Sequence, residues 1–343
     1  MTNNKTPIDF VITWVDGSDP VWLKEKNNYL KQEKPEDVVT SIDVSVSRYR
    51  DWETLQYWFR GVEKYAPWVN KIHFVTWGHL PAWLNIEHPK LHIVRHEDYI
   101  PEKYLPTFSS HPIELNFHRI PGLAEHFVYF NDDVFLTAPV VPEDFFVNGL
   151  PCDSVSESPI PCDNQGIWSH ILVNNVAFLN RHFSKKEVKK QHYKKWYSLK
   201  STKDMIKNMI LSTVKRDSFF GLSTHHIHQA YLKSSFEQIW NMEPELLDRT
   251  CKNRFRSQED ICHFIIREYQ LLKGNFHVKN MYKMGHAFHD NTSFQTAADA
   301  LRHQQYKVIC LNDTDQVHFE EAKKLILHAF QTILPETSSF EQF

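Results

Sequence analysis

Short apolar runs alternate with amphipathic segments over residues 1–140. Four apolar runs have the length of a buried strand and are bounded by turn residues. They cover residues 8–15, 71–77, 91–94 and 125–136. Apolar residues at helical spacing precede the second and the fourth run, over residues 52–65 and 113–124. Strands separated by helices predict an α/β fold with a mostly parallel sheet, right-handed crossovers and flanking helices.

The second half of the chain shows the same two patterns less regularly. The predicted elements there are helices through residues 236–240, over 261–272 and over 319–334, and a strand at 307–311. We therefore expect an α/β half over residues 1–150 and an insertion of loop and basic helix over residues 151–222. Residues 223–343 are expected to complete the first domain and to end in a helix.

Composition is typical of a globular protein. Of the 343 residues 41% are hydrophobic and 14% aromatic, which suffices for a sizeable core. The formal charge of −3 gives no positive field that would favour nucleic acid. Five cysteines without a Cys-x-x-Cys pair indicate neither a disulfide framework nor a zinc knuckle. No signal-peptide core and no apolar run of membrane-spanning length occurs, so we expect a cytoplasmic protein.

Positive charge is concentrated in one segment. Residues 181–216 contain twelve Lys and Arg against two acids, an excess of ten. Trp196 and Tyr197 lie among these lysines, and such a helix can rest on an anionic membrane. The segment therefore predicts peripheral contact with the inner face of the plasma membrane. A solvated helix face is the alternative, because the apolar side of the segment is only moderately clear.

Polar residues end the fourth apolar run. Asn131, Asp132 and Asp133 directly follow its aromatic residues. Open α/β sheets bind ligands at the carboxyl ends of their strands, and two adjacent acids there repel each other unless a cation lies between them. The pattern predicts a divalent cation that holds nucleotide phosphates, although a turn that caps a following helix explains it equally well. The strand predicted at 307–311 also ends on polar residues, Asn312 and Asp313, and the two acidic ends could meet.

Two stretches near the N-terminus carry further candidates. The first strand runs into Asp16, Gly17 and Ser18, where the polar side chains could receive a base and a ribose while glycine lets the backbone approach closely. A plain Asp-Gly turn is the simpler interpretation. Arg48 and Arg50 precede a helix and could both reach phosphate oxygens. An ion pair with the neighbouring aspartate explains either arginine alone equally well.

Histidines supply the candidate proton acceptor. His226 and His228 lie close together, but a zinc site needs three or four protein ligands and no third one is nearby. A general base is therefore the preferred role for one of them. Glu114 and His118 fall on one face of a predicted helix, four residues apart, with Arg119 adjacent. A surface pair is the simpler explanation for these two.

Longer motifs in the chain resemble a known family. They are Trp14-Val15-Asp16-Gly17-Ser18-Asp19-Pro20, Arg48-Tyr49-Arg50-Asp51, Leu105-Pro106-Thr107-Phe108, His118-Arg119-Ile120-Pro121-Gly122-Leu123 and Asn131-Asp132-Asp133. These resemble the first two conserved regions of the Stealth proteins, bacterial sugar-1-phosphate transferases of capsular and exopolysaccharide synthesis that are related to the lysosomal-enzyme GlcNAc-1-phosphotransferase. Residues 226–260 resemble the third region, and Cys310-Leu311-Asn312-Asp313 the fourth. The third region differs at His226-Ile227-His228, where the family has His-x-Pro, and His226 is the residue that aligns with the base.

The resemblance implies a GT-A-like core and a reaction at phosphorus. A UDP-sugar would give up its sugar-1-phosphate to a hydroxyl of an acceptor glycan, which a membrane lipid can carry, and UMP would be released. The implied catalytic residues are His226, Asp133, Arg256 and Asp313. The implied nucleotide-sugar-binding residues are Trp14, Asp16, Gly17, Ser18, Arg48, Arg50, His118 and Arg119. The implied ligands of a Mg²⁺ or Mn²⁺ ion are Asp132, Asp133 and Asp313.

Two other classes of protein share some of these features. A conventional metal-dependent glycosyltransferase also places acids at strand ends, but it releases UDP and forms a glycoside. A non-catalytic carbohydrate-binding module would use the ten Trp and thirteen Tyr as stacking platforms. Most of these aromatic residues recur at helix or strand spacing, which favours a role in the core.

Overall fold

The computed structural model describes residues 6–33, 42–43, 50–161, 167–288, 293–313 and 318–342. Its α-helices are α1 (Pro20–Glu33), α2 (Leu55–Tyr65), α3 (His96–Tyr99), α4 (Ser110–Leu115), α5 (Trp168–His182), α6 (Lys185–Gln191), α7 (Tyr193–Trp196), α8 (Thr202–Ser212), α9 (Lys233–Met242), α10 (Pro244–Lys252), α11 (Phe264–Leu272), α12 (Met281–Met284), α13 (Ser293–Arg302) and α14 (Phe319–Ile333). Its strands are β1 (Ile8–Trp14), β2 (Ile42–Asp43), β3 (Ile72–Thr76), β4 (Leu91–Arg95), β5 (His126–Phe130), β6 (Val134–Leu136), β7 (Phe146–Val147), β8 (Leu150–Asp153), β9 (Gln229–Leu232), β10 (Arg256–Ser257), β11 (His277–Val278), β12 (Gly285–Phe288) and β13 (Val308–Leu311).

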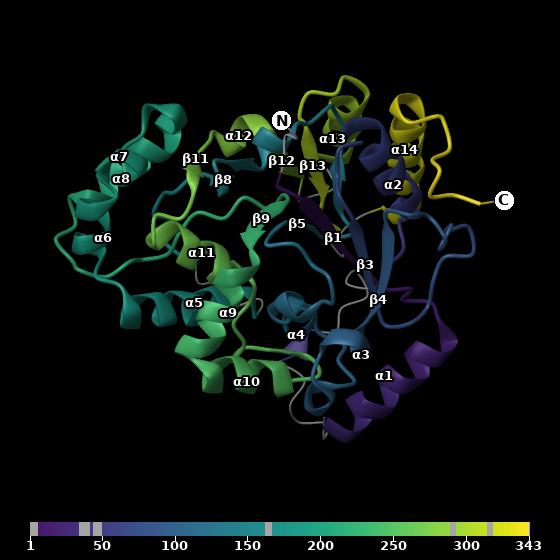
Figure 1. Cartoon of the computed structure of the whole chain (residues 1–343), viewed down its shortest axis with the longest axis horizontal. Coiled ribbons are helices and arrows are strands. Elements are labelled where there is room, and N and C mark those ends of the chain that lie inside the picture. Colours follow the sequence, from purple (N-terminus) through teal and green to yellow (C-terminus); the bar gives the residue numbers. More distant parts are fainter. Residues whose placement is uncertain are drawn as a thin grey trace.

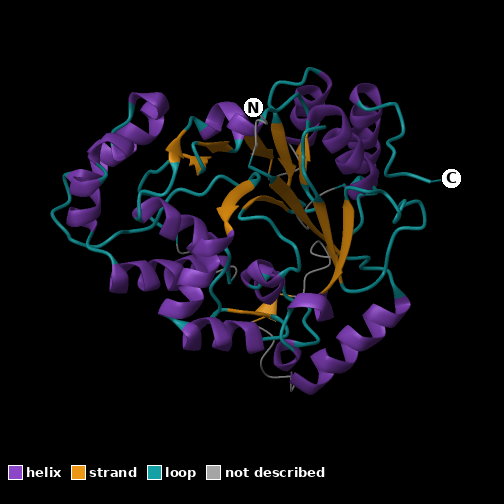
Figure 2. Cartoon of the chain, viewed as in Figure 1, coloured by secondary structure: helices purple, strands orange, loops and turns teal. Residues whose placement is uncertain are grey.

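A five-stranded sheet of order β4-β3-β1-β5-β9 forms the centre of the molecule (Figures 1 and 2). Neighbours among β4, β3, β1 and β5 pair in parallel, and β9 runs antiparallel to β5. The predicted α/β fold with a mostly parallel sheet and flanking helices is therefore confirmed. The pattern of apolar residues does not predict β9, because this short strand runs into α9 without a turn residue between them.

Each face of this sheet is covered by an apolar core. Successive side chains of a strand point to opposite faces, so Phe10 and Phe130 join the core built with α2 and α14. Val11 and Phe127 join the core on the other face, which includes residues of α9 and α11. Burial on both faces explains why β1 and β5 appear in the sequence as continuous apolar runs.

Helix α2 fixes the position of the strand that follows the acidic turn. Its buried residues include Leu55, Trp58 and Tyr65, the apolar stripe that the sequence predicts. Gly61 faces β6 so closely that a Cβ atom there would lie 2.8 Å from the carbonyl oxygen of Leu136. Only glycine allows this close approach of the helix to the strand.

A small sheet of order β12-β13-β6 joins the two acidic strand ends. β13 runs antiparallel to β6, and Cys310 lies opposite Val134. The residues that follow β13 therefore lie beside the residues that precede β6. This pairing brings Asp313 and Asp133 to the same edge of the fold.

The helix predicted at 113–124 is much shorter than expected. α4 ends at Leu115, where the Asn116 side chain donates a 2.8 Å hydrogen bond to the Pro112 carbonyl. A single 3-10 turn follows, and then Pro121 and Gly122, whose φ of 75° ends helical structure. Glu114 and His118 therefore do not share a helix face, which corrects that prediction.

The segment with excess positive charge, residues 181–216, contains the last two residues of α5 and the helices α6 to α8, and these three helices lie at one end of the molecule (Figure 1). Val188 and Trp196 of this segment belong to the same core as Val11. No helix within the described ranges has the length and apolar character needed to cross a bilayer.

Candidate functional site

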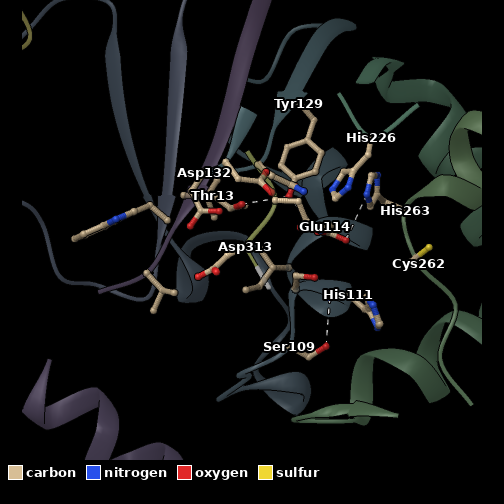
Figure 3. Close-up of a pocket in the computed structure, with 18 of the residues that line it drawn as sticks. Thr13, Ser109, His111, Glu114, Tyr129, Asp132, His226, Cys262, His263 and Asp313 are labelled. Carbon is tan, nitrogen blue, oxygen red and sulfur yellow. Dashed lines mark hydrogen bonds and ion pairs between the residues drawn. The ribbon is translucent and has the colours of Figure 1, made fainter. Parts of the chain in front are cut away.

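A cavity of about 650 Å³ lies at the carboxyl ends of β1 and β5. Parallel sheets commonly bind ligands at this edge. The predicted site residues that line it are Trp14, Arg50, Asp132, Asp133, His226, Arg256 and Asp313. Segments that lie far apart in the sequence thus contribute to one site, as Figure 3 shows for Asp132, His226 and Asp313.

The acidic turn between β5 and β6 forms one wall of the cavity. The Val134 N–H donates to the Asn131 carbonyl at 3.1 Å, so these residues do form a turn, although a strand and not a helix follows. Oδ1 of Asp133 is buried and has no hydrogen-bond partner among the described residues. Its other oxygen lies 3.4 Å from the Cys310 thiol, which donates to it. A buried carboxylate oxygen without a donor is costly unless a ligand satisfies it.

Asp132 is exposed to the cavity, and the protein around it removes part of its solvation. This desolvation raises the pKa of Asp132, and the negative charge of Asp133 raises it further. Asp51 acts in the same direction, whereas Arg256 partly offsets the shift. A cation bound between the carboxylates would favour their ionised form.

Asp313 lies across from this turn and is held by two side chains. Its Oδ2 atom accepts a 3.2 Å hydrogen bond from the Trp52 indole N–H and lies 3.5 Å from Nε of Arg50. The Arg50 guanidinium also lies over the Phe319 ring, at 4.6 Å. Arg50 is thereby held in the cavity wall.

The three neighbouring histidines lie in different environments. His226 lines the cavity. His228 is 2% exposed and packs against the rings of Phe130 and Phe145, and burial lowers its pKa to about 3. His225 contacts the Ser154 hydroxyl, and burial lowers its pKa to about 4. Of the two histidines considered for the base, the structure brings only His226 to the cavity.

A buried acid that the sequence analysis assigned to a surface pair also lines the cavity. Glu114 is 4% exposed and accepts a 3.0 Å hydrogen bond from the Tyr129 hydroxyl. The ring of His263 lies beside it, with Nε2 3.9 Å from Oε2 of Glu114 (Figure 3). The Tyr231 hydroxyl lies 2.7 Å from the other ring nitrogen, Nδ1 of His263. Burial raises the pKa of Glu114 to about 7, although Arg256 favours its ionised form. The only sequence signal for this role was that Glu114 belongs to the helix predicted at 113–124, directly ahead of the acidic strand.

Arg256 reaches the cavity from the short strand β10, and the turn that follows this strand is organised by a buried carboxylate. Asp260 accepts a 2.9 Å hydrogen bond from the Ser257 N–H and lies 2.8 Å from Nδ1 of His111. Nη2 of Arg256 donates to the Ser110 hydroxyl at 2.9 Å, at the start of α4. The guanidinium is therefore positioned by two segments before any ligand arrives.

Not all predicted nucleotide-sugar contacts line the cavity. Asp16 accepts hydrogen bonds from the Ser18 N–H at 2.8 Å and the Ser18 hydroxyl at 2.6 Å, in a turn with Gly17 that adjoins the cavity wall. His118 and Arg119 lie elsewhere, against the ring of Trp240. Burial lowers the pKa of His118 to about 3, so it packs there as a neutral ring. Arg48 lies outside the described residues.

Family models match two parts of the chain. Residues 6–34 match conserved region 1 of the Stealth proteins, and residues 48–152 match conserved region 2. The second match contains Glu114, Asp132 and Asp133 of the cavity wall.

Full-length relatives extend this similarity over the whole chain. Capsular polysaccharide phosphotransferase WcwK of Streptococcus pneumoniae is 41% identical over 99% of both chains. Receptor polysaccharide phosphotransferase WefC of Streptococcus oralis is 39% identical over 97% of this chain and 99% of its own length. Exopolysaccharide phosphotransferase cps2G of Lactiplantibacillus plantarum is 35% identical over 99% of this chain and 98% of its own.

Solved structures are less similar. The galactosyltransferase LgtC in complex with donor and acceptor sugar analogs is 13% identical, with coverage of 96% and 98% and a TM-score of 0.37. The bifunctional glycosyltransferase WbbM is 11% identical, with coverage of 96% and 52% and a TM-score of 0.36. These scores are too low to add to the description of the fold.

An α/β fold with a cavity of acids, arginines and histidine at the strand ends, together with full-length phosphotransferase relatives, defines an enzyme of the phosphotransferase class. The chain belongs to the Stealth protein family.

Proposed function

We propose that this protein transfers a sugar-1-phosphate from a UDP-sugar to a hydroxyl of an acceptor glycan in a cell-surface polysaccharide. The observation that carries the proposal is the convergence of Asp133, Asp313, Arg50, Arg256 and His226 on one cavity. Phosphoryl transfer depends on charge neutralisation and in-line positioning, and these residues offer both. The polysaccharide phosphotransferases named above support the same reaction class.

The two acidic strand ends fit a divalent cation. Asp133 and Asp313, with Asp132, would hold a Mg²⁺ or Mn²⁺ ion, since both ions bind carboxylate oxygens. The buried and unpartnered Oδ1 of Asp133 supports this fit. When bound, such an ion neutralises charge on the diphosphate oxygens. Arg50 and Arg256 would bind phosphate oxygens, and Trp14, with the turn that contains Asp16 and Ser18, would contact the nucleoside.

His226 would accept the proton of the acceptor hydroxyl. As that proton leaves, the acceptor oxygen forms a bond to the phosphorus that carries the sugar. The bond from this phosphorus to the bridging oxygen breaks, and UMP leaves with that oxygen. The bond between the sugar and its own oxygen survives, so the product is a phosphodiester with unchanged anomeric configuration.

Product analysis tests this proposal. The purified protein is incubated with Mg²⁺ or Mn²⁺, a panel of nucleotide sugars, and oligosaccharides prepared from bacterial capsule. Release of UMP together with a phosphodiester product is expected. Release of UDP with a plain glycoside would instead show a conventional glycosyltransferase. Glycan binding that persists in excess chelator, without turnover of any donor, would show a binding module.

We also propose that α8 and its flanking turns rest on an anionic membrane. Six large apolar side chains of this region are between 44% and 78% exposed: Tyr193, Leu199, Ile206, Met209, Ile210 and Val214. The opposite face of α8 is buried through Asp204 and Asn208. The face of α8 that carries Ile206, Met209 and Ile210 is therefore apolar and points to solvent. The sequence indicated this apolar face only weakly.

Some cationic side chains of residues 181–216 are buried and paired, and others are exposed at the surface. Lys185 and Lys189 are buried and pair with Glu157, and Lys195 donates to the carbonyls of Gly274 and Phe276. The exposed lysines and arginine of α7, α8 and the adjoining turns are Lys194, Lys200, Lys203, Lys215 and Arg216. Exposed apolar side chains and cations in one region match the surface of an anionic bilayer.

A further inference from the structure

We propose that Asp133, His226 and Cys310 form a binding site for a thiophilic divalent cation such as Zn²⁺, and that its occupation inhibits the enzyme. The binding part of the proposal stands on geometry alone. The inhibition part rests on the proposed function, in which His226 is the base and Asp133 holds a different ion.

The three side chains offer ligand atoms in one small volume. A carboxylate oxygen, an imidazole nitrogen and the Cys310 sulfur all lie within 4.8 Å of one another. Tetrahedral zinc, with bonds of about 2.0–2.3 Å, places its ligand atoms roughly 3.5 Å apart. Small side-chain movements would therefore close the site, and a water molecule would take the fourth position.

The backbone holds these ligands close together independently of any ion. Cys310 lies in β13 and faces Val134 of β6, directly after the acidic turn. Its side chain is fully buried behind Asp133, with the sulfur 3.4 Å from Oδ2. Asp133 and His226 line the cavity, so an ion would enter from that side and reach the sulfur between them.

Ligand chemistry separates this site from the one proposed for Mg²⁺ or Mn²⁺. Sulfur and imidazole nitrogen favour zinc, whereas Mg²⁺ takes oxygen ligands and water. Binding replaces the S–H bond with a sulfur–metal bond and releases the proton to solvent. The two ions share Asp133, so they compete for it.

This site supplies the third ligand that the sequence alone did not reveal. His226 and His228 looked like two ligands without a third, but His228 packs against aromatic rings. The additional ligands come instead from Asp133 and Cys310, which are 177 residues apart in the chain and adjacent in space. Their pairing depends on the contact between β6 and β13.

Cobalt binding tests the site without any substrate. The protein is cleared of metal with chelator, kept reduced with a phosphine, and titrated with Co²⁺, whose thiolate complexes absorb in the near ultraviolet. The wild-type protein and a Cys152→Ser control, which changes a buried cysteine outside the cluster, should show this band, and Zn²⁺ should displace it. Cys310→Ser should lose the band while its Tm in chelator stays close to that of the control.

Inhibition is measured separately, as UMP release at fixed Mg²⁺ with increasing Zn²⁺. For each protein, the Zn²⁺ concentration that halves its own uninhibited rate is determined. This concentration should be at least about tenfold higher for Cys310→Ser than for the wild-type protein, because one of three protein ligands is lost. No cobalt band in the wild-type protein, or a band that persists in Cys310→Ser, would overturn the site. Equal zinc sensitivity in both proteins would overturn the inhibition. A band that depends on Cys310 in a protein that releases UMP from no donor would uphold the site and reject the proposed function.

Discussion

At the residue scale, burial decides which side chains can exchange protons in the cavity. His228 and His263 are enclosed by protein, and burial lowers the pKa of each to about 3. Both rings therefore stay neutral at physiological pH. His226 is partly exposed and lines the cavity, where an acceptor hydroxyl could reach it. This difference in environment supports the proposal that His226 is the base.

Replacing His226 by Ala should lower the rate of sugar-phosphate transfer by about 100- to 10,000-fold, the usual contribution of a general base. Binding of the UDP-sugar should change little, because the arginines and the acidic strand ends remain. Rates of UMP release and donor affinity by calorimetry measure the two effects. His328→Ala is the matched control, since this histidine is exposed on α14. A His226→Ala protein that works at the wild-type rate would exclude this role.

Glu114 predicts how stability depends on pH. Its pKa is about 7 in the folded protein because of burial, against an ordinary value of 4.5. Between these values the folded protein binds more protons than the unfolded chain, so stability falls as pH rises from about 4.5 to 7. Glu114→Gln removes this contribution and keeps an oxygen for the Tyr129 hydroxyl.

Tm is measured in chelator from pH 5 to 8 for the wild-type protein and for Glu114→Gln. The variant should gain stability relative to the wild type as pH rises. Glu237→Gln, which changes an exposed glutamate of α9, should follow the wild type throughout. Parallel curves for Glu114→Gln and the wild type would show that the Glu114 carboxyl does not have a raised pKa.

At the element scale, the sequence predicts the parts of the fold that depend on local periodicity. The strands β1, β3, β4 and β5 and the stripe of α2 agree with it. β1, β3 and β5 are buried along most of their length, which gives continuous apolar runs, and α2 buries one face at helical spacing. The short α4 and the edge strand β9 do not agree. The end of α4 depends on the Asn116 side chain, and the length of β9 depends on its pairing with β5. Neither contact can be seen in a pattern of apolar residues.

The contact between α2 and β6 gives a prediction about stability. Alanine normally favours a helix over glycine by about 1 kcal/mol. At Gly61 the added Cβ would meet the Leu136 carbonyl oxygen at 2.8 Å, so α2 and β6 would have to move apart. Gly61→Ala should therefore destabilise the protein by about 1–3 kcal/mol.

Denaturant unfolding measures this effect as a shift of the midpoint. Gln56→Ala adds an alanine to the same helix at a partly exposed position and should leave the midpoint nearly unchanged. Because β6 follows the acidic turn, Gly61→Ala should also weaken Mg²⁺-dependent activity. A stabilised Gly61→Ala protein would mean that the helix and strand are not in close contact.

At the scale of the whole molecule, the site depends on contacts between distant segments. The sequence suggested that the acidic ends before β6 and after β13 could meet, and the antiparallel pairing of these strands explains why they do. It could not show that Glu114 faces the cavity while His118 packs against Trp240, because the chain turns away after α4. The arrangement of Glu114, Tyr129 and His263 likewise depends on tertiary contacts alone.

The exposed apolar face of α8 predicts that the whole molecule binds to the surface of an anionic membrane. Each exposed lysine or arginine near an anionic bilayer contributes about 1 kcal/mol, and insertion of the apolar side chains adds to this. The double variant Ile206→Glu, Ile210→Glu places two acids on that face and should lower binding to vesicles with anionic lipid at least about tenfold. Ile86→Glu is the control, since Ile86 is 48% exposed and lies outside the α5 to α8 segment.

Co-sedimentation with anionic and neutral vesicles, at low and high salt, measures the effect. Wild-type binding should fall with salt and on neutral vesicles, because the electrostatic attraction is screened or lost. Equal binding to both kinds of vesicle, or equal binding by the double variant and the control, would show that this face does not dock on an anionic membrane.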